Sequence, residues 1–216
     1  MRATGWLLTA AILTTPVTTA VGAQAQSRPD QKAFLGLDKE LVETNTTLSS
    51  GSCTQAAAQI GARLKTAGYT DADITYFSVP EHPKDGGLVA VLKGSDASIK
   101  PMLLLAHLDV VEAKREDWER DPFKLIEEGG YYYARGTVDD KAQAAIWSDA
   151  MIRFKTSGYK PKRTIKLALT CGEETTFAWN GAQYLAKSKP DLIAAEFALS
   201  EGGGGRLTIT IVRFGL

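Results

Sequence analysis

The sequence predicts an α/β fold, with a mostly parallel mixed sheet flanked by helices. Apolar segments of strand length alternate along the chain with longer segments of helical spacing, a pattern typical of layered α/β proteins. Acidic and imidazole side chains follow several of the expected strands, where open α/β sheets place their ligands. The chain has 216 residues and is 44% hydrophobic, which is enough for the core of one domain of ordinary size.

The individual elements follow from hydrophobic periodicity and from the turn-forming residues between them. Helices are expected over 32–48, 54–67, 142–154 and 181–188. Strands are expected over 74–79, 87–92, 101–105, 164–169 and 195–199, with a hairpin joining 123–126 to 131–133. The segment EHPKDGG, residues 81–87, is expected to be a turn, and RLTITIVRFGL, residues 206–216, one short strand.

The charge balance of the chain bears on the class of partner, and the hydropathy of its first residues bears on its location. Lys+Arg and Asp+Glu are both 25, so no basic excess favours nucleic acid. Residues 1–25 have a positive start, an apolar stretch and small residues near Ala25, which predicts a cleaved secretory signal and a periplasmic or secreted domain over 26–216. The apolar stretch is too short and broken for a stable membrane span; an uncleaved anchor is the alternative.

The chain contains two cysteines, Cys53 and Cys171. An exported protein permits a disulfide between them, although the sequence does not establish one. A buried free thiol is equally compatible with Cys171, because that residue ends an apolar run.

Four short motifs carry the side chains that are suited to metal binding. They are AHLDVV with His107 and Asp109, GTVDDK with Asp139 and Asp140, CGEETT with Glu173 and Glu174, and LSEGG with Glu201. Clustered carboxylates repel one another unless a cation lies between them. One imidazole with several carboxylates therefore predicts a site for zinc, with cobalt or manganese as alternatives. A carboxylate beside a ligating histidine also orients its ring, which gives Asp109 a role beside His107.

Each motif also has an ordinary structural explanation when it is taken alone. A histidine near a strand end is more often structural than a ligand, and paired aspartates commonly start a helix. Paired glutamates usually lie on a solvated face, and a run of glycines is often a flexible turn. The four motifs together, each after an expected strand, favour the metal site.

At these residues the chain resembles the M20 family of metallopeptidases, which includes carboxypeptidases, aminoacylases and dipeptidases. The resemblance runs over about 32–205 and corresponds to the N-terminal part of the family's catalytic domain. It is carried by HLDVV, by W..DPF at 118–123, by RGTVDDK and by EGGG.

The resemblance implies a role for each matching position. His107 and Glu201 correspond to ligands of a first zinc ion, Glu174 to a ligand of a second, and Asp139 to the carboxylate that bridges the two. Asp109 corresponds to the carboxylate that orients the histidine, and the peptide bond before Asp140 is typically cis in relatives. Glu173 corresponds to the general base.

This set of roles implies a hydrolase that cleaves a peptide or N-acyl amide bond with a water activated by two zinc ions. The expected substrates are peptides or N-acyl amino acids. Glu173 would take the proton of that water and pass it to the leaving amine.

The chain also departs from the family pattern. Ala142 stands where relatives have glycine, and no histidine follows His107 to serve the second metal. The family's lid or dimerisation domain is absent, so we expect a truncated chain that is weak or inactive alone, with a homodimer possible only in the full-length form. Two alternatives stay open, namely a non-catalytic metal-binding remnant and an aminopeptidase of the M28 type.

Overall fold

A computed structural model describes residues 28–175 and 178–201 of the chain. Its main sheet has five strands in the order β1-β2-β6-β3-β7. The strands are β1 (Ile74–Val79), β2 (His82–Leu92), β3 (Met102–His107), β6 (Ile165–Thr170) and β7 (Phe197–Leu199). β2 is antiparallel to both of its neighbours, whereas β3 is parallel to β6 and to β7. Four strands thus share one direction and β2 opposes them, which confirms the mostly parallel mixed sheet.

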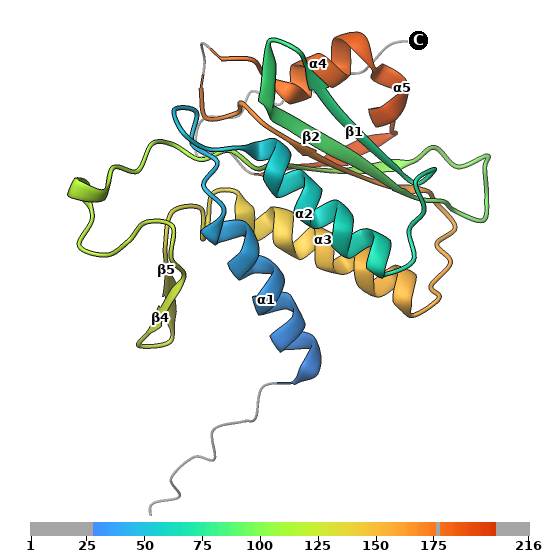
Figure 1. The fold of residues 1–216 in the computed structure, drawn as a ribbon. Coiled ribbons are helices and arrows are strands. Elements are labelled where there is room, and N and C mark those ends of the chain that lie inside the picture. Colours follow the sequence, from blue (N-terminus) through green and yellow to red (C-terminus); the bar gives the residue numbers. More distant parts are fainter. Residues whose placement is uncertain (1–27, 176–177, 202–216) are drawn as a thin grey trace, which may run out of the picture.

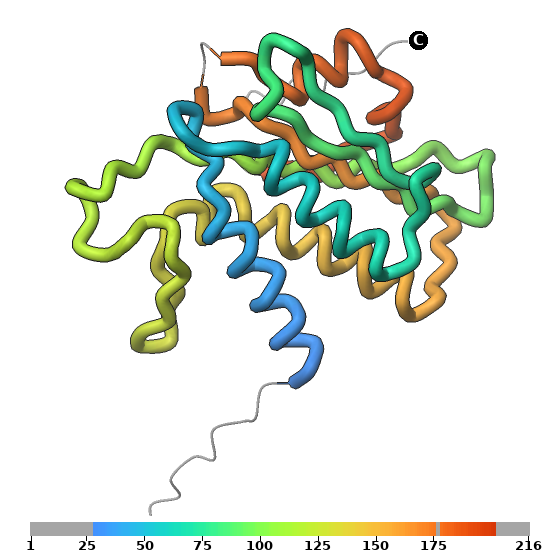
Figure 2. Tube along the Cα trace, in the orientation of Figure 1, coloured from blue at the N-terminus to red at the C-terminus, as the bar shows by residue number. Residues whose placement is uncertain are grey.

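Helices cover both faces of this sheet (Figure 1). On one face lie α1 (Pro29–Glu43), α2 (Cys53–Thr66) and α3 (Lys141–Thr156), and on the other lie α4 (Gly181–Ser188) and α5 (Pro190–Ile193). A short 3-10 helix, η1 (Arg115–Asp117), precedes a separate hairpin of β4 (Ile126–Glu128) and β5 (Tyr131–Tyr133). The tube in Figure 2 shows this hairpin projecting away from the sheet.

The core is divided between the two faces because side chains alternate along each strand. Leu88 and Ala90 of β2 point toward the cluster beneath α1, α2 and α3, whereas Val89 joins the cluster on the α4 side. β6 alternates in the same way, with Leu167 facing the first cluster and Ala168 the second. Helices on both sides thus explain why the central strands are apolar on both faces.

The strand order brings distant loops together at one edge of the sheet. β3 and β6 run side by side in register, with His107 opposite Thr170, and β7 flanks β3 on its other side. Because these three strands are parallel, the segments that follow them leave the sheet at the same edge. Three of the four motifs lie at the ends of these strands, and the GTVDDK motif, which precedes α3, joins them through the contacts of Asp139 and Asp140 with His107.

The first expected helix was too long, and the reason is local. α1 ends at Glu43 rather than at residue 48. The side chain of Asn45 accepts hydrogen bonds from the N–H and the hydroxyl of Thr47, and such asparagine turns compete with helical hydrogen bonds. Leu48, expected on the apolar face of a helix, is 53% exposed.

The expected turn over 81–87 was wrong. β2 begins at His82, so Pro80 and Glu81 alone connect it to β1. This half of β2 pairs with β1 but not with β6, whose register begins at Leu88. A strand segment with one free edge tolerates Pro83, which has no N–H to donate.

Two smaller shifts matter for the site and for the hairpin. β3 extends to His107, which is therefore the last residue of the strand rather than a loop residue. The hairpin turns at Gly129 and Gly130, both with positive φ, so β4 starts at Ile126 instead of residue 123. The other expected elements are found with ends displaced by two residues or fewer.

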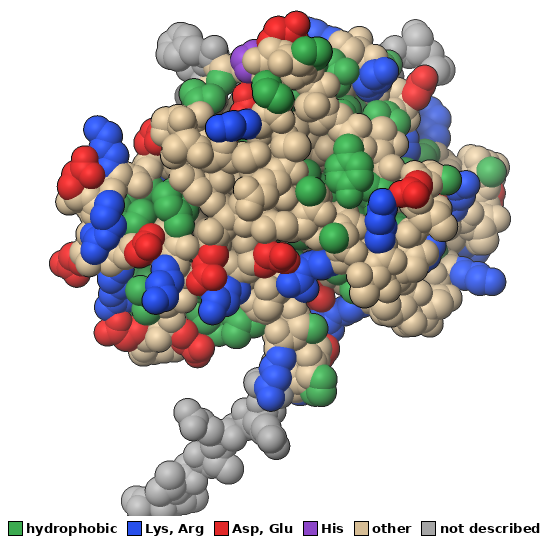
Figure 3. All heavy atoms as spheres, in the orientation of Figure 1, with side chains coloured by type: hydrophobic (Ala, Val, Ile, Leu, Met, Phe, Trp, Pro, Cys, Tyr) green, Lys and Arg blue, Asp and Glu red, His purple; other side chains and the backbone are tan. Residues whose placement is uncertain are grey.

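Some sequence predictions fall outside the described residues. These are the signal over 1–25 and the strand over 206–216. Within the described part, no helix combines the length and the hydropathy that crossing a membrane requires. On the face drawn in Figure 3, acidic and basic side chains lie interspersed.

Candidate metal centre

His107 is the last residue of β3. Asp109 lies beside its ring nitrogen Nδ1, and the other ring nitrogen, Nε2, is available to a metal. The side chain of His107 is 3% exposed. Nδ1 lies 3.0 Å from the main-chain oxygen of Asp109 and 3.5 Å from that residue's carboxylate Oδ1. Both neighbours are acceptors, so in the neutral ring the proton belongs on Nδ1 and the lone pair on Nε2. The main-chain oxygen of Asp109 therefore orients the ring, whereas the carboxylate Oδ1, to which that role was assigned, makes no hydrogen bond within the described residues.

Nε2 of His107 faces three carboxylates. It lies 3.1 Å from Asp139 Oδ1, 3.5 Å from Glu201 Oε1 and 3.8 Å from Glu173 Oε2. Ligand atoms of His107, Asp139 and Glu201 all lie within 4.8 Å of one another. Among the described residues the buried Nε2 makes no well-aligned hydrogen bond, although Asp139 Oδ1 lies only 3.1 Å away. A buried lone pair beside carboxylates is the arrangement that a divalent cation completes.

The field at this position is strongly negative. Burial alone would lower the pKa of His107, but Asp109, Asp140 and Glu201 outweigh it and raise that pKa to about 10. A site that holds a proton this firmly also attracts a metal cation, which competes for the same lone pair. The residues therefore fit a divalent cation held by His107, Asp139 and Glu201.

Asp140 has a role that the sequence analysis did not assign. It directly precedes α3, as a helix-starting aspartate does, but its side chain makes no capping hydrogen bond. Its Oδ2 instead accepts the main-chain N–H of His107 at 3.1 Å. The peptide bond between Asp139 and Asp140 is cis, as the family resemblance implied. The two residues joined by this peptide bond thus contact the same histidine, Asp139 at its ring and Asp140 at its main-chain N–H.

Glu173 and Glu174 approach from the loop after β6. The N–H of Glu174 donates to Asp109 Oδ2 at 2.9 Å, so Asp109 supports both His107 and this loop. Burial raises the pKa of Glu173, and the carboxylates of Glu201, Asp109 and Asp139 raise it further. A raised pKa suits a carboxylate that takes up a proton during a reaction.

Glu174 stands apart from the first group of ligands. Its carboxylate is not among the three groups gathered within 4.8 Å. Burial raises the pKa of Glu174, and so does the nearby carboxylate of Asp139. Its assignment to a second metal, together with Asp139, stays a prediction.

Lys141, the third residue of the DDK run, also belongs to the surroundings of the site. Its side chain is fully buried at the start of α3, and Nζ donates to the main-chain oxygen of Thr44 at 2.6 Å. Burial lowers the pKa of Lys141 to about 7, although Asp109 and Asp38 oppose that shift. The position of this lysine, directly after the paired aspartates of the GTVDDK motif, was the available signal.

The two cysteines form a disulfide, Cys53–Cys171. This pairing resolves the alternative of a buried free thiol at Cys171. Both cysteines are buried, and the bond joins the first residue of α2 to the residue that follows β6.

The fold and this centre define a class, the metal-dependent hydrolases built on a zinc-peptidase-like α/β domain. The model of peptidase family M20/M25/M40 matches residues 103–213, which is just over half of the chain. The chain therefore belongs to peptidase family M20/M25/M40. This membership favours the M20 assignment over the M28-type alternative.

Individual relatives agree with the family assignment. The chain is 33% identical over 163 residues to the N-fatty-acyl-amino acid synthase/hydrolase PM20D1 of Homo sapiens, a match that covers 75% of this chain and 32% of the relative. It is 38% identical over 119 residues to the Beta-Ala-Xaa dipeptidase of Lactobacillus delbrueckii subsp. lactis, covering 52% and 25% respectively. The chain thus spans about a third or less of the length of these curated relatives.

A solved structure supports the fold independently. Human carnosine dipeptidase 1 superposes with a TM-score of 0.64 at 22% sequence identity, covering 80% of this chain and 39% of that one. At this identity the likeness concerns the fold alone.

Proposed function

We propose that this chain carries the metal centre of a hydrolase that cleaves peptide or N-acyl amide bonds. The observation that carries the proposal is the buried Nε2 of His107, which makes no well-aligned hydrogen bond within the described residues and faces the carboxylates of Asp139, Glu173 and Glu201. The names of the relatives, an N-acyl-amino acid hydrolase and a dipeptidase, support the substrate class.

His107, Asp139 and Glu201 would hold one zinc ion, and Asp139 with Glu174 would contribute to a second. When bound, the metal supplies Lewis acidity that activates water and polarises the scissile carbonyl. Cobalt or manganese would suit the same nitrogen and oxygen donors.

Asp109 and Glu173 have the remaining roles in the proposed reaction. Asp109 keeps the proton of His107 on Nδ1 and so leaves Nε2 free as a ligand. Glu173 has a side chain that is 53% exposed and lies 3.8 Å from Nε2, where it can accept a proton from water and deliver it to the leaving amine.

Zinc binding and turnover of the full 216-residue chain test the proposal. Zinc affinity is measured by competition with a chromogenic chelator, and hydrolysis is measured on dipeptides and on N-acyl amino acids. We expect tight binding of one zinc ion, because the gathered ligands include a single imidazole, and slow turnover. Failure to bind zinc would contradict the proposal.

The variant Glu173→Gln tests the role of Glu173 as general base and leaves the proposed metal ligands unchanged. This variant should keep its zinc and lose about 100-fold or more in turnover, since general-base catalysis contributes roughly that factor. The matched control is Glu127→Gln, a glutamate on the exposed hairpin, which should change neither. Tight zinc binding without turnover in the parent chain would instead favour a non-catalytic metal-binding module, a second candidate that is supported by the single imidazole among the three gathered ligands.

We also propose that the protein is exported and that its signal is removed near Ala25. N-terminal sequencing of the protein purified from its source should then begin close to Gln26. A sequence that begins at Met1 would contradict this proposal.

A further inference from the structure

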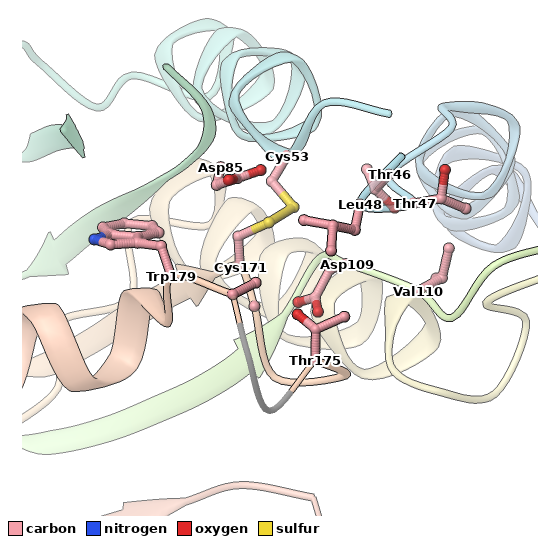
Figure 4. A pocket seen from close by; sticks show the side chains of 12 residues that line it. Thr46, Thr47, Leu48, Cys53, Asp85, Asp109, Val110, Cys171, Thr175 and Trp179 are labelled. Atoms are coloured by element: carbon pink, nitrogen blue, oxygen red, sulfur yellow. A yellow bond between two sulfur atoms is a disulfide. The ribbon is translucent and has the colours of Figure 1, made fainter. Parts of the chain in front are cut away.

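The disulfide lies directly behind the loop that carries Glu173 and Glu174. Cys171 follows β6, and the two glutamates come immediately after Gly172. Cys53 begins α2, 118 residues earlier, and the two Cα atoms are 6.0 Å apart. Figure 4 shows the bond between the start of α2 and this loop, with the side chain of Asp109 close by.

Hydrogen bonds also hold the described part of the loop. The Asn180 side chain donates to Gly172 O at 2.9 Å, and the Gly181 N–H donates to Cys171 O at 2.7 Å. On the other side, Glu174 N–H donates to Asp109. Gly172 has φ +85°, and an added Cβ would lie 2.0 Å from the main-chain oxygen of Trp179. The backbone therefore makes a tight turn between the disulfide and the glutamates.

The far end of the covalent link is itself well anchored. Cys53 is 1% exposed and belongs to the main core cluster. The hydroxyl of Ser52 caps α2 by accepting the N–H of Gln55 at 3.2 Å. The disulfide thus connects the loop to a helix that packs against β2, an element that carries none of the candidate ligands.

Electrostatic repulsion between the carboxylates of the site gives the disulfide a positioning role. The carboxylates of Asp139 and Glu173 approach the same nitrogen, His107 Nε2, at 3.1 and 3.8 Å, and groups of like charge this close together repel one another. Without a bound cation, their repulsion drives the loop after β6 away from His107. A covalent bond next to the glutamates opposes that displacement.

We propose that the Cys53–Cys171 disulfide positions the metal centre by keeping Glu173 and Glu174 turned toward His107. The inference rests on the proposed function and adds a positioning element to it. The competing explanation is that the bond only stabilises the fold, as cross-links do by restricting the unfolded chain.

The test compares the full chain with Cys53→Ala/Cys171→Ala. Substitution is preferable to a reducing agent, because free thiols at these positions would lie with Asp109 within 4.8 Å and would bind zinc themselves. The matched control is Leu64→Ala, which keeps the disulfide and creates a cavity at the other end of α2, where Leu64 is fully buried. All measurements are made well below every melting temperature.

We expect the alanine pair to bind zinc about 10- to 100-fold more weakly, the range typical for loss of groups that support metal ligands. The absorption spectrum of the Co²⁺-loaded protein should change as well, because the ligand geometry changes. Leu64→Ala should bind zinc within about threefold of the parent even if it melts at a lower temperature, since distant sites act independently.

The inference would be overturned if the alanine pair and Leu64→Ala had the same zinc affinity and the same Co²⁺ spectrum. That result would leave the proposed function intact. A parent chain that binds no zinc would overturn both. If the alanine pair does not fold, Cys53→Ala/Cys171→Val, which restores buried volume, is judged by the same criteria.

Discussion

The candidate centre has a buried half and an exposed half. In the buried half, the side chains of His107 and Asp109 are 3% and 7% exposed. In the exposed half, the side chains of Asp139, Glu173 and Glu201 are 60%, 53% and 33% exposed. The buried half is tied to the sheet by main-chain hydrogen bonds, whereas the exposed half approaches from loops.

The difference shows how such a site is prepared. His107 receives a defined orientation before any metal arrives, because Asp109 and Asp140 hold its ring and its backbone. The exposed carboxylates repel one another and are drawn together by the cation itself. We therefore expect changes in the buried half to cost more zinc affinity than changes in the exposed half.

Loss of the imidazole should have the largest effect. His107→Ala should weaken zinc binding by more than about 100-fold, which is about 2.7 kcal/mol, since removing a ligand exceeds the usual cost of disturbing its support. Zinc at about 100 times its Kd should raise the parent's Tm by roughly 5–10 °C. Differential scanning calorimetry with and without zinc should show no such rise for the variant; an equal rise would place the metal elsewhere.

Asp109→Asn should come next, with zinc binding about 10- to 100-fold weaker. The substitution keeps the shape of the side chain but removes the negative charge beside Nδ1 and weakens the acceptor for the Glu174 N–H. Chelator competition measures the effect. Unchanged affinity would mean that the main-chain oxygen of Asp109 alone orients His107.

Glu201→Gln should have a smaller effect, about tenfold or less, because water can replace a partly exposed ligand atom. The comparison between Asp109→Asn and Glu201→Gln sharpens the distinction between the two halves. If the Glu201 variant binds zinc more weakly than the Asp109 variant, the buried half does not dominate the affinity.

Tyr69→Phe, outside both halves, should leave zinc affinity unchanged and lower the free energy of unfolding by about 1 kcal/mol. Its hydroxyl donates to Met151 O at 3.0 Å in the core. Burial raises the pKa of Tyr69 above its ordinary value, so this contribution is present below about pH 10 and is lost as the pH rises further. Denaturant melts at pH 8 and pH 11 should therefore show the difference from the parent shrinking.

Much of the fold was predictable from the sequence because periodicity is a local property. The segments over 74–79 and 181–188 were predicted with the bounds that the structure shows. The misjudged segments are those where local chemistry or pairing intervened, such as the Asn45 turn that ends α1 early and the β1 partner that extends β2 through Pro83.

By itself, the sequence determined the α/β class, the order of the elements and the residue types able to bind a metal. Hydrophobic spacing and motif chemistry can be read one segment at a time. Only the tertiary structure decided that His107, Asp139 and Glu201 meet, that Asp140 accepts the His107 N–H, and that Cys53 pairs with Cys171. Contacts of this kind join residues far apart in the chain, and they are set by strand order and packing rather than by any local pattern.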